Sequence, residues 1–122
     1  MEPVLARLAE LQALETDWDT YGALPLTSTA LSRADVMMRT VLNLYGGTFG
    51  DRVAPYSVMP IVDGGVAIEW RGPNADLNLD IGPSGALSYL LIVRGEEGRT
   101  FEEEYDVSDQ HALDLVRRVI GG

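Results

Sequence analysis

The side chains that could transfer protons in this sequence are one histidine and a number of carboxylates. A nucleophilic enzyme needs a base that a third group orients. His111 is the only histidine, and it stands among acids in the first turn of a C-terminal helical pattern, which is typical of a surface residue. No serine lies in a Gly-x-Ser-x-Gly segment, and the chain has no cysteine. The sequence therefore predicts no catalytic residue and no enzyme activity.

Two groups of carboxylates are close enough along the chain to bind a cation. Asp17 and Asp19 flank a tryptophan, and Asp63 and Glu69 lie around an Asp-Gly-Gly turn. Neither group has the spacing of a calcium loop, and the local interpretation of Asp19 is that it accepts N–H groups of the following turn. We therefore expect no metal and no cofactor. The residues that form either a structural clasp or an alternative ligand site are Trp18, Asp19, Tyr21, Gly22, Asp63, Glu69 and Trp70.

The first third of the chain has the apolar spacing of two helices. The pattern predicts one helix over 2–15 and a second that begins at Thr27 or Ser28 and runs to about Tyr45. Gly46-Gly47 is expected to end the second helix, because glycine is favoured just past a helix C-terminus.

Beyond the second helix the apolar period changes to two, which predicts strands. Asp63-Gly64 favours a two-residue hairpin loop, and such a loop places Met59 opposite Ile68 on the core face. Pro60 lacks a backbone donor, so its strand should lie at a sheet edge. The next turn, Gly72-Pro73-Asn74-Ala75, predicts a second hairpin. Its core-face pairs are Trp70 with Leu77, Ile68 with Leu79, and Val66 with Ile81, and the opposite face is polar at almost every pair.

The fourth predicted strand differs from the others because it is apolar on both sides. Leu87, Tyr89, Leu91 and Val93 are expected to face the core, which leaves Leu90 and Ile92 on the back of the sheet. The last strand follows over 99–105. A one-residue choice in the preceding turn decides whether its aromatic residues, Phe101 and Tyr105, face the core or the back.

These patterns together predict one α+β domain over residues 1–122. It has two N-terminal helices, an antiparallel β-meander of about five strands and a C-terminal helix capped by Ser108.

Charge is the unusual bulk property of the chain. The net charge is −10 at pH 7, which disfavours binding to nucleic-acid backbones and to anionic membranes. No apolar run approaches the roughly 18 residues of a membrane span, and charges interrupt the N-terminus where a signal peptide needs an apolar stretch. We expect a soluble cytoplasmic protein. Its acidity favours solubility or a basic partner.

Two short motifs resemble those of small uncharacterised bacterial proteins. The first is Trp18-Asp19-x-Tyr21-Gly22-Ala23 with Pro25, and the second is Asp63-Gly64-Gly65 in a strand that ends at Glu69-Trp70. The resemblance covers roughly residues 8–90. It implies no particular activity, since none is established for these proteins.

We expect a non-enzymatic, acidic protein-interaction module, such as an antitoxin, an immunity protein or an accessory protein that binds a more basic partner. The predicted partner-binding residues are those of the acidic last strand and its apolar neighbours, namely Leu90, Ile92, Phe101, Glu102, Glu103 and Glu104. Two alternatives stay open. One is a small-molecule or cation-binding domain with its site near the Trp-Asp-Thr-Tyr-Gly-Ala connector. The other is a structural protein that forms a homo-oligomer through the sheet face or the edge of the last strand.

Overall fold

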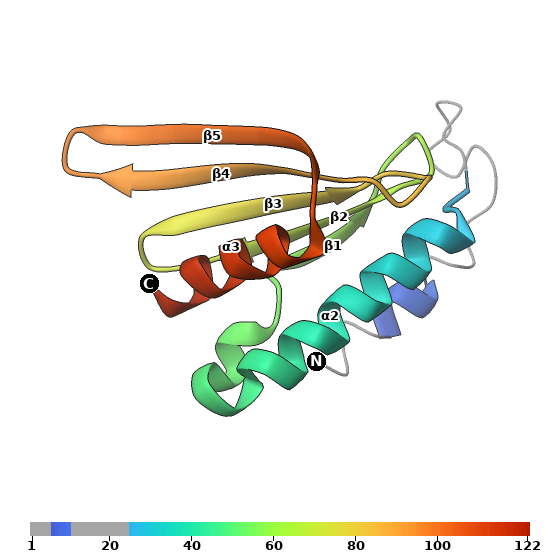
Figure 1. Cartoon of the computed structure of the whole chain (residues 1–122), viewed down its shortest axis with the longest axis horizontal. Coiled ribbons are helices and arrows are strands. Elements are labelled where there is room, and N and C mark those ends of the chain that lie inside the picture. The colour runs from blue at the N-terminus through green and yellow to red at the C-terminus, as the bar shows by residue number, and fades with distance from the viewer. Residues whose placement is uncertain (1–5, 11–24) are drawn as a thin grey trace.

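The computed structural model describes residues 6–10 and 25–122, and Figure 1 shows how the elements are arranged. Residues 6–10 are helical. The elements that follow are α2 (Ser28–Phe49), the 3-10 helix η1 (Gly50–Val53), β1 (Ser57–Pro60), β2 (Val66–Arg71), β3 (Ala75–Ile81), β4 (Leu87–Gly95), β5 (Gly98–Val107) and α3 (Asp109–Gly121).

The architecture is α+β, with helices on an antiparallel five-stranded sheet. The strand order is β1-β2-β3-β4-β5, so the sheet is the predicted meander. Helices α2 and α3 pack against each other and on the same side of the sheet, as Figure 1 shows. The expected pair of N-terminal helices is matched only in part, by a short helical segment at 6–10 and the long α2. The remainder of the first predicted helix, over 2–15, lies outside the described residues.

The core lies between the helices and the inward face of the sheet. Trp70 is fully buried there, and its Nε1 donates to the Val53 carbonyl 3.0 Å away. Leu8 from the short N-terminal segment joins the same core, and the neighbouring Arg7 donates through Nε to the Val58 carbonyl at 3.3 Å.

The β2–β3 register is the predicted one, with Trp70 opposite Leu77. The predicted β1–β2 register is wrong by one residue, since Val58 rather than Met59 lies opposite Ile68. The reason is the loop between the strands, which is longer than two residues. The Asp63 carboxylate accepts the N–H of Gly65 at 2.9 Å, and Gly65 in turn accepts the N–H of Ile61 at 2.9 Å. Met59 consequently faces outward and Val58 inward.

The predicted end of α2 at Gly46-Gly47 is also wrong. The helix begins after Thr27, whose hydroxyl accepts the N–H of Ala30 as expected, but it continues to Phe49. Gly50 ends it with a positive φ of 59°. Contacts of the last turn explain the extension, because Phe49 packs against the core and Tyr45 donates from its hydroxyl to the Leu113 carbonyl at 3.2 Å.

Strands β4 and β5 form a hairpin that projects past the other strands in Figure 1. At the end of the hairpin opposite its turn, the register shifts between Leu87 and Tyr89. Two residues of β5, Tyr105 and Asp106, therefore lie opposite one residue of β4. Asp106 has a positive φ of 53°, a conformation that aspartate adopts more readily than most residues. The bulge returns Val107 to the core face, opposite Leu87.

Candidate functional site

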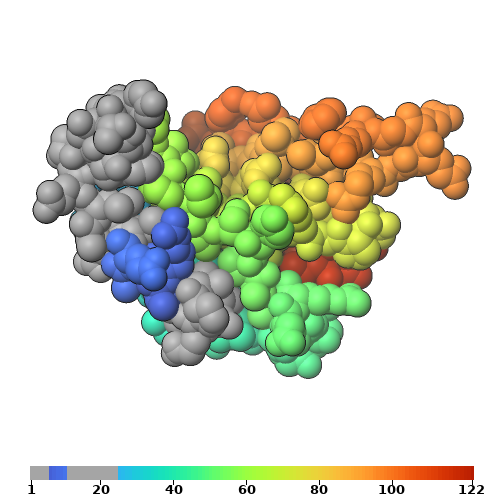
Figure 2. Space-filling model, turned by 180° about the vertical axis from the view of Figure 1, so that it is seen from behind, coloured from blue at the N-terminus to red at the C-terminus, as the bar shows by residue number. Residues whose placement is uncertain are grey.

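The face of the sheet opposite α2 and α3, here called the open face, carries an apolar stripe along β4 and β5. Because strand residues alternate between faces, Leu90 and Ile92 point away from the core, and Phe101 pairs with Ile92 on the same side. Phe101 is 66% exposed and Tyr105 71% exposed, while Leu90 and Ile92 are half-buried. Figure 2 shows the molecule from this side, with the strands in front of α3. The structure thus places the aromatic residues of the last strand on the back of the sheet.

Two adjoining hollows lie on the open face at the bulged end of β5. The one of about 360 Å³ is lined in part by Asp80, Leu90 and Glu103, and the one of about 280 Å³ by Asp63, Asp80 and Asp106. They share Asp80, Ser88 and Tyr105. We call the pair the acidic hollow and define it by Asp63, Asp80, Ser88, Glu103, Tyr105 and Asp106.

The four carboxylates of the acidic hollow have no cationic neighbour within the described residues. None of Asp63, Asp80, Glu103 or Asp106 belongs to an ion pair there, although most other acids on the sheet do. Glu103 accepts a hydrogen bond from the Tyr105 hydroxyl, and Asp63 accepts the N–H of Gly65. Burial raises the pKa of Asp80, and the negative charge of Asp63 raises this pKa further. No ion pair among the described residues therefore neutralises the negative charge of the hollow.

The opposite face of β5 has a different role, because its acids contact α3. Glu104 lies 3.4 Å from His111 Nε2, and Glu102 lies 3.9 Å from Arg118. Between them the Tyr89 hydroxyl is buried, and burial, followed by the charges of Glu102 and Glu104, raises the pKa of Tyr89. These contacts attach β5 to α3.

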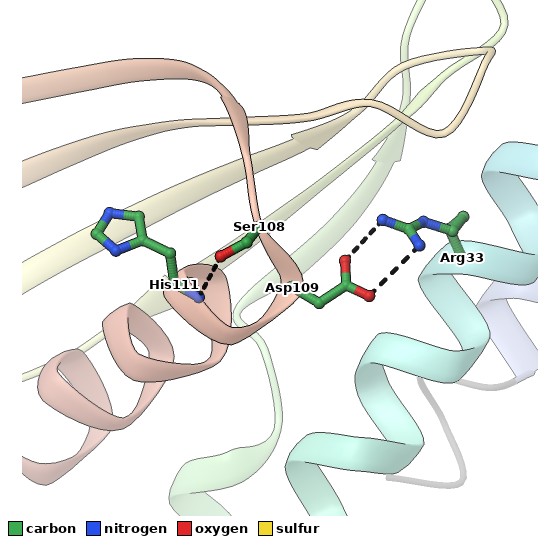
Figure 3. Close-up of polar contacts among 4 residues, drawn as sticks. All are labelled: Arg33, Ser108, Asp109 and His111. Carbon is green, nitrogen blue, oxygen red and sulfur yellow. Dashed lines mark hydrogen bonds and ion pairs between the residues drawn. The ribbon is translucent and has the colours of Figure 1, made fainter.

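Polar contacts also fix the start of α3, as Figure 3 shows. The Ser108 hydroxyl accepts the backbone N–H of His111 at 3.1 Å, so Ser108 is the predicted cap. Asp109 accepts two hydrogen bonds from Arg33 of α2, at 2.6 and 3.4 Å. His111 is half-exposed and its ring lies 5.6 Å from that of Tyr89. Nothing in this arrangement orients His111 toward a nucleophile.

The structure divides the predicted partner-binding residues between two faces. Leu90, Ile92, Phe101 and Glu103 lie together on the open face, whereas Glu102 and Glu104 lie on the helix side. Their sequence neighbours in the acidic hollow, Tyr105 and Asp106, were not among the predicted residues.

The residues of the alternative ligand site do not converge where the structure describes them. Trp18, Asp19, Tyr21 and Gly22 lie outside the described residues. Trp70 is in the core, as the structural interpretation requires, while Glu69 points to the other face and pairs with Arg71. Asp63 lies in the acidic hollow, toward the opposite end of β2.

A separate cleft of about 400 Å³ lies beside η1 and β2. It is lined in part by Arg52, Tyr56 and Arg71, and the Arg71 guanidinium stacks 3.4 Å from the centre of the Tyr56 ring. This stacking and the ion pair with Glu69 already occupy Arg71. Across residues 6–10 and 25–122, no group of three or more potential metal ligands is close enough to hold an ion.

Comparison with known proteins returns no matching family model, no similar curated protein and no similar solved structure. Among the described helices, none combines the length and the apolar character that crossing a membrane requires.

Two features of this surface could not be found from the sequence alone. The bulge at Asp106 turns Tyr105 and Asp106 toward Asp80, which is distant in sequence. The longer β1–β2 loop brings Asp63 to the same place. The only sequence signal was the alternation on β3, which assigns Asp80 to the outward face opposite Ala67.

Proposed function

We propose that the protein is a non-enzymatic binding module that recognises a more basic protein in the cytoplasm through its open face. One observation carries the proposal. Four carboxylates that form no ion pair within the described residues gather in the acidic hollow, directly beside the apolar stripe in which Leu90 and Ile92 are half-buried and Phe101 is exposed. Interfaces commonly combine an apolar centre with charged groups that orient the partner.

The chemistry of this surface fits a lysine or arginine side chain presented next to an apolar residue. The methylene stem of such a side chain can lie on Leu90 and Tyr105 while its charge enters the hollow. The incoming cation would stabilise the ionised form of Asp80, which burial and Asp63 now disfavour. An antitoxin, an immunity protein or an accessory protein that masks a basic partner is the kind of protein that we propose.

The proposal is tested by co-expressing the full chain with the product of the adjacent gene and purifying the pair. We expect a stoichiometric complex. The double substitution Asp80→Asn with Glu103→Gln should lower its affinity by roughly tenfold or more, because in the proposed complex both carboxylates contact the partner's cations. Isothermal titration calorimetry measures the affinity, and far-UV circular dichroism verifies that the variant is folded.

The matched control is Glu102→Gln with Glu104→Gln, which removes the same charge from the same strand on the helix side. This control should leave the affinity nearly unchanged. An equal loss in both double variants would show that only net charge matters, and would contradict a site on the open face. The absence of any complex with a protein partner would contradict the function itself.

A further inference from the structure

The outer edge of β5 is a second feature of the molecule that could bind a strand. β5 is the last strand of the sheet, and in the described part of the chain nothing pairs with its outer side. All its residues from Gly98 to Asp106 are exposed. It contains neither proline nor lysine, two residues that commonly prevent an edge strand from pairing with another chain. Its pairing with β4 is regular up to the bulge.

We propose that β5 pairs antiparallel with β5 of a second copy of this chain, with Phe101 opposite Phe101. In an antiparallel pair related by a twofold axis, side chains directly opposite each other lie on the same face. A centre at Phe101 places Arg99 of each copy opposite Glu103 of the other. Both residues lie on the open face with Phe101, because Arg99, Phe101 and Glu103 pair with Arg94, Ile92 and Leu90 of β4. The strand is therefore self-complementary in charge about its aromatic centre.

Other registers of the same strand lack this complementarity. A centre at Glu102, Glu103 or Glu104 puts that glutamate opposite its own copy, and like charges directly opposite each other are destabilising. Because opposite residues must share a face, Arg99 can meet an acid of β5 only when Phe101 is central. In this register Thr100 lies opposite Glu102 on the helix side, a pair without repulsion. The charges thus select one alignment.

This dimer would extend the proposed binding surface without being required for it. The twofold axis runs perpendicular to the sheet, so both open faces point the same way and the two sheets become one. The apolar stripes, each formed by Leu90, Ile92 and Phe101, then meet across the axis. A partner would encounter a wider apolar area with the carboxylates of Asp63, Asp80 and Asp106 at either end, while each Glu103 pairs with Arg99 of the other copy.

The experiment is a charge swap measured by sedimentation velocity on the full chain, from about 10 μM to about 1 mM protein. The unmodified protein should show a concentration-dependent dimer. Arg99→Glu alone and Glu103→Arg alone should each raise the dimer dissociation constant by roughly tenfold, because two attractive pairs become repulsive. The double variant, with both substitutions, should return the dissociation constant close to its original value.

Glu97→Arg is the control, because Glu97 lies in the β4–β5 turn outside the paired segment. It should not change the dimer. A monomer at every concentration, or a double variant that fails to recover, would overturn the proposal. Arg99→Glu leaves all four acids of the hollow in place, so loss of the dimer can be told apart from loss of partner binding.

Discussion

At the scale of single residues, Asp80 carries a charge that its surroundings disfavour. It lies on the outward side of β3, opposite Ala67 on one neighbouring strand and Ser88 on the other. Neither neighbour offers a cation, and Asp63 lies in the same hollow. The raised pKa of Asp80 shows that the fold disfavours its charged form. A charged residue that lowers the stability of the folded protein is a candidate for a role in binding.

We expect Asp80→Asn to stabilise the free protein at pH 7. The folded state raises the pKa of Asp80, so between the ordinary carboxyl pKa of 3.8 and the raised value the folded state binds more protons than the unfolded state. Stability therefore falls as the pH rises through this range, and the full penalty is present at neutral pH. Removing the charge should gain roughly half a kcal/mol, a small effect because solvent screens the hollow.

Urea unfolding followed by circular dichroism at several pH values measures this gain. The difference between Asp80→Asn and the unmodified protein should shrink as the pH falls and vanish below about pH 3.8. Glu97→Gln, in the β4–β5 turn, is the control and should show no such trend. A gain that is the same at every pH would indicate a packing effect and would remove the electrostatic argument.

At the scale of elements, two glycines have opposite roles that the sequence does not distinguish. A Cβ on Gly72, in the β2–β3 turn, would lie 1.9 Å from the Val119 carbonyl oxygen of α3. A Cβ on Gly47, within α2, would meet nothing within 4 Å. Gly72 is thus required for α3 to approach the sheet, whereas Gly47 only weakens the helix that contains it.

Gly72→Ala should therefore destabilise the fold by about 2 kcal/mol or more, because helix or turn must move to relieve the contact. Gly47→Ala should stabilise it by about 0.5–1 kcal/mol, the usual difference between the two residues inside a helix. Thermal and urea unfolding of both variants measure these changes. A stabilised Gly72→Ala would mean that α3 does not pack as described. A destabilised Gly47→Ala would mean that α2 ends where the sequence predicted.

An element of the fold could be predicted from the sequence where several independent features of the sequence indicated the same structure. The β2–β3 register was predictable because apolar residues alternate on one side and polar residues on the other, so a shift by one would bury Glu69 and Asn78. The β1 strand is short, and its loop depends on local hydrogen bonds such as those from the Gly65 N–H to the Asp63 carboxylate and from the Ile61 N–H to the Gly65 carbonyl. The helix end and the bulge likewise depend on tertiary contacts.

The same distinction applies to the candidate site. The outward positions of Leu90 and Ile92 could be found because apolar residues on the outward side of a strand break the expected alternation, whereas the face of Phe101 depended on the length of the preceding turn. The acidic hollow could not, because it joins Asp63, Asp80 and Asp106 from three separate segments through two local irregularities. Sequence reasoning placed Leu90 and Ile92 on the back of the sheet and a run of acids on the last strand, but it could not assign each acid to a face.

At the scale of the whole molecule, the net charge of −10 has two effects that salt weakens, one unfavourable for the fold and the other favourable for binding a basic partner. Self-repulsion destabilises the compact state, and dissolved ions reduce it. Attraction between an acidic face and a basic partner accelerates their encounter, and ions reduce this too. A single titration with salt therefore distinguishes the effect of the charge on the stability of the free protein from its effect on the rate of association with a basic partner.

We expect that raising sodium chloride from about 20 mM to about 300 mM increases the melting temperature of the free protein and lowers the association rate with its partner by roughly tenfold. The dissociation rate should change much less if, as proposed, short-range packing on Leu90, Ile92 and Phe101 holds the complex together once it has formed. Differential scanning calorimetry gives the first quantity and stopped-flow mixing the second. If salt altered only the dissociation rate, the acids would act within the contact and would not steer the approach, and the acidic hollow would have to be the centre of the interface with the apolar stripe at its rim.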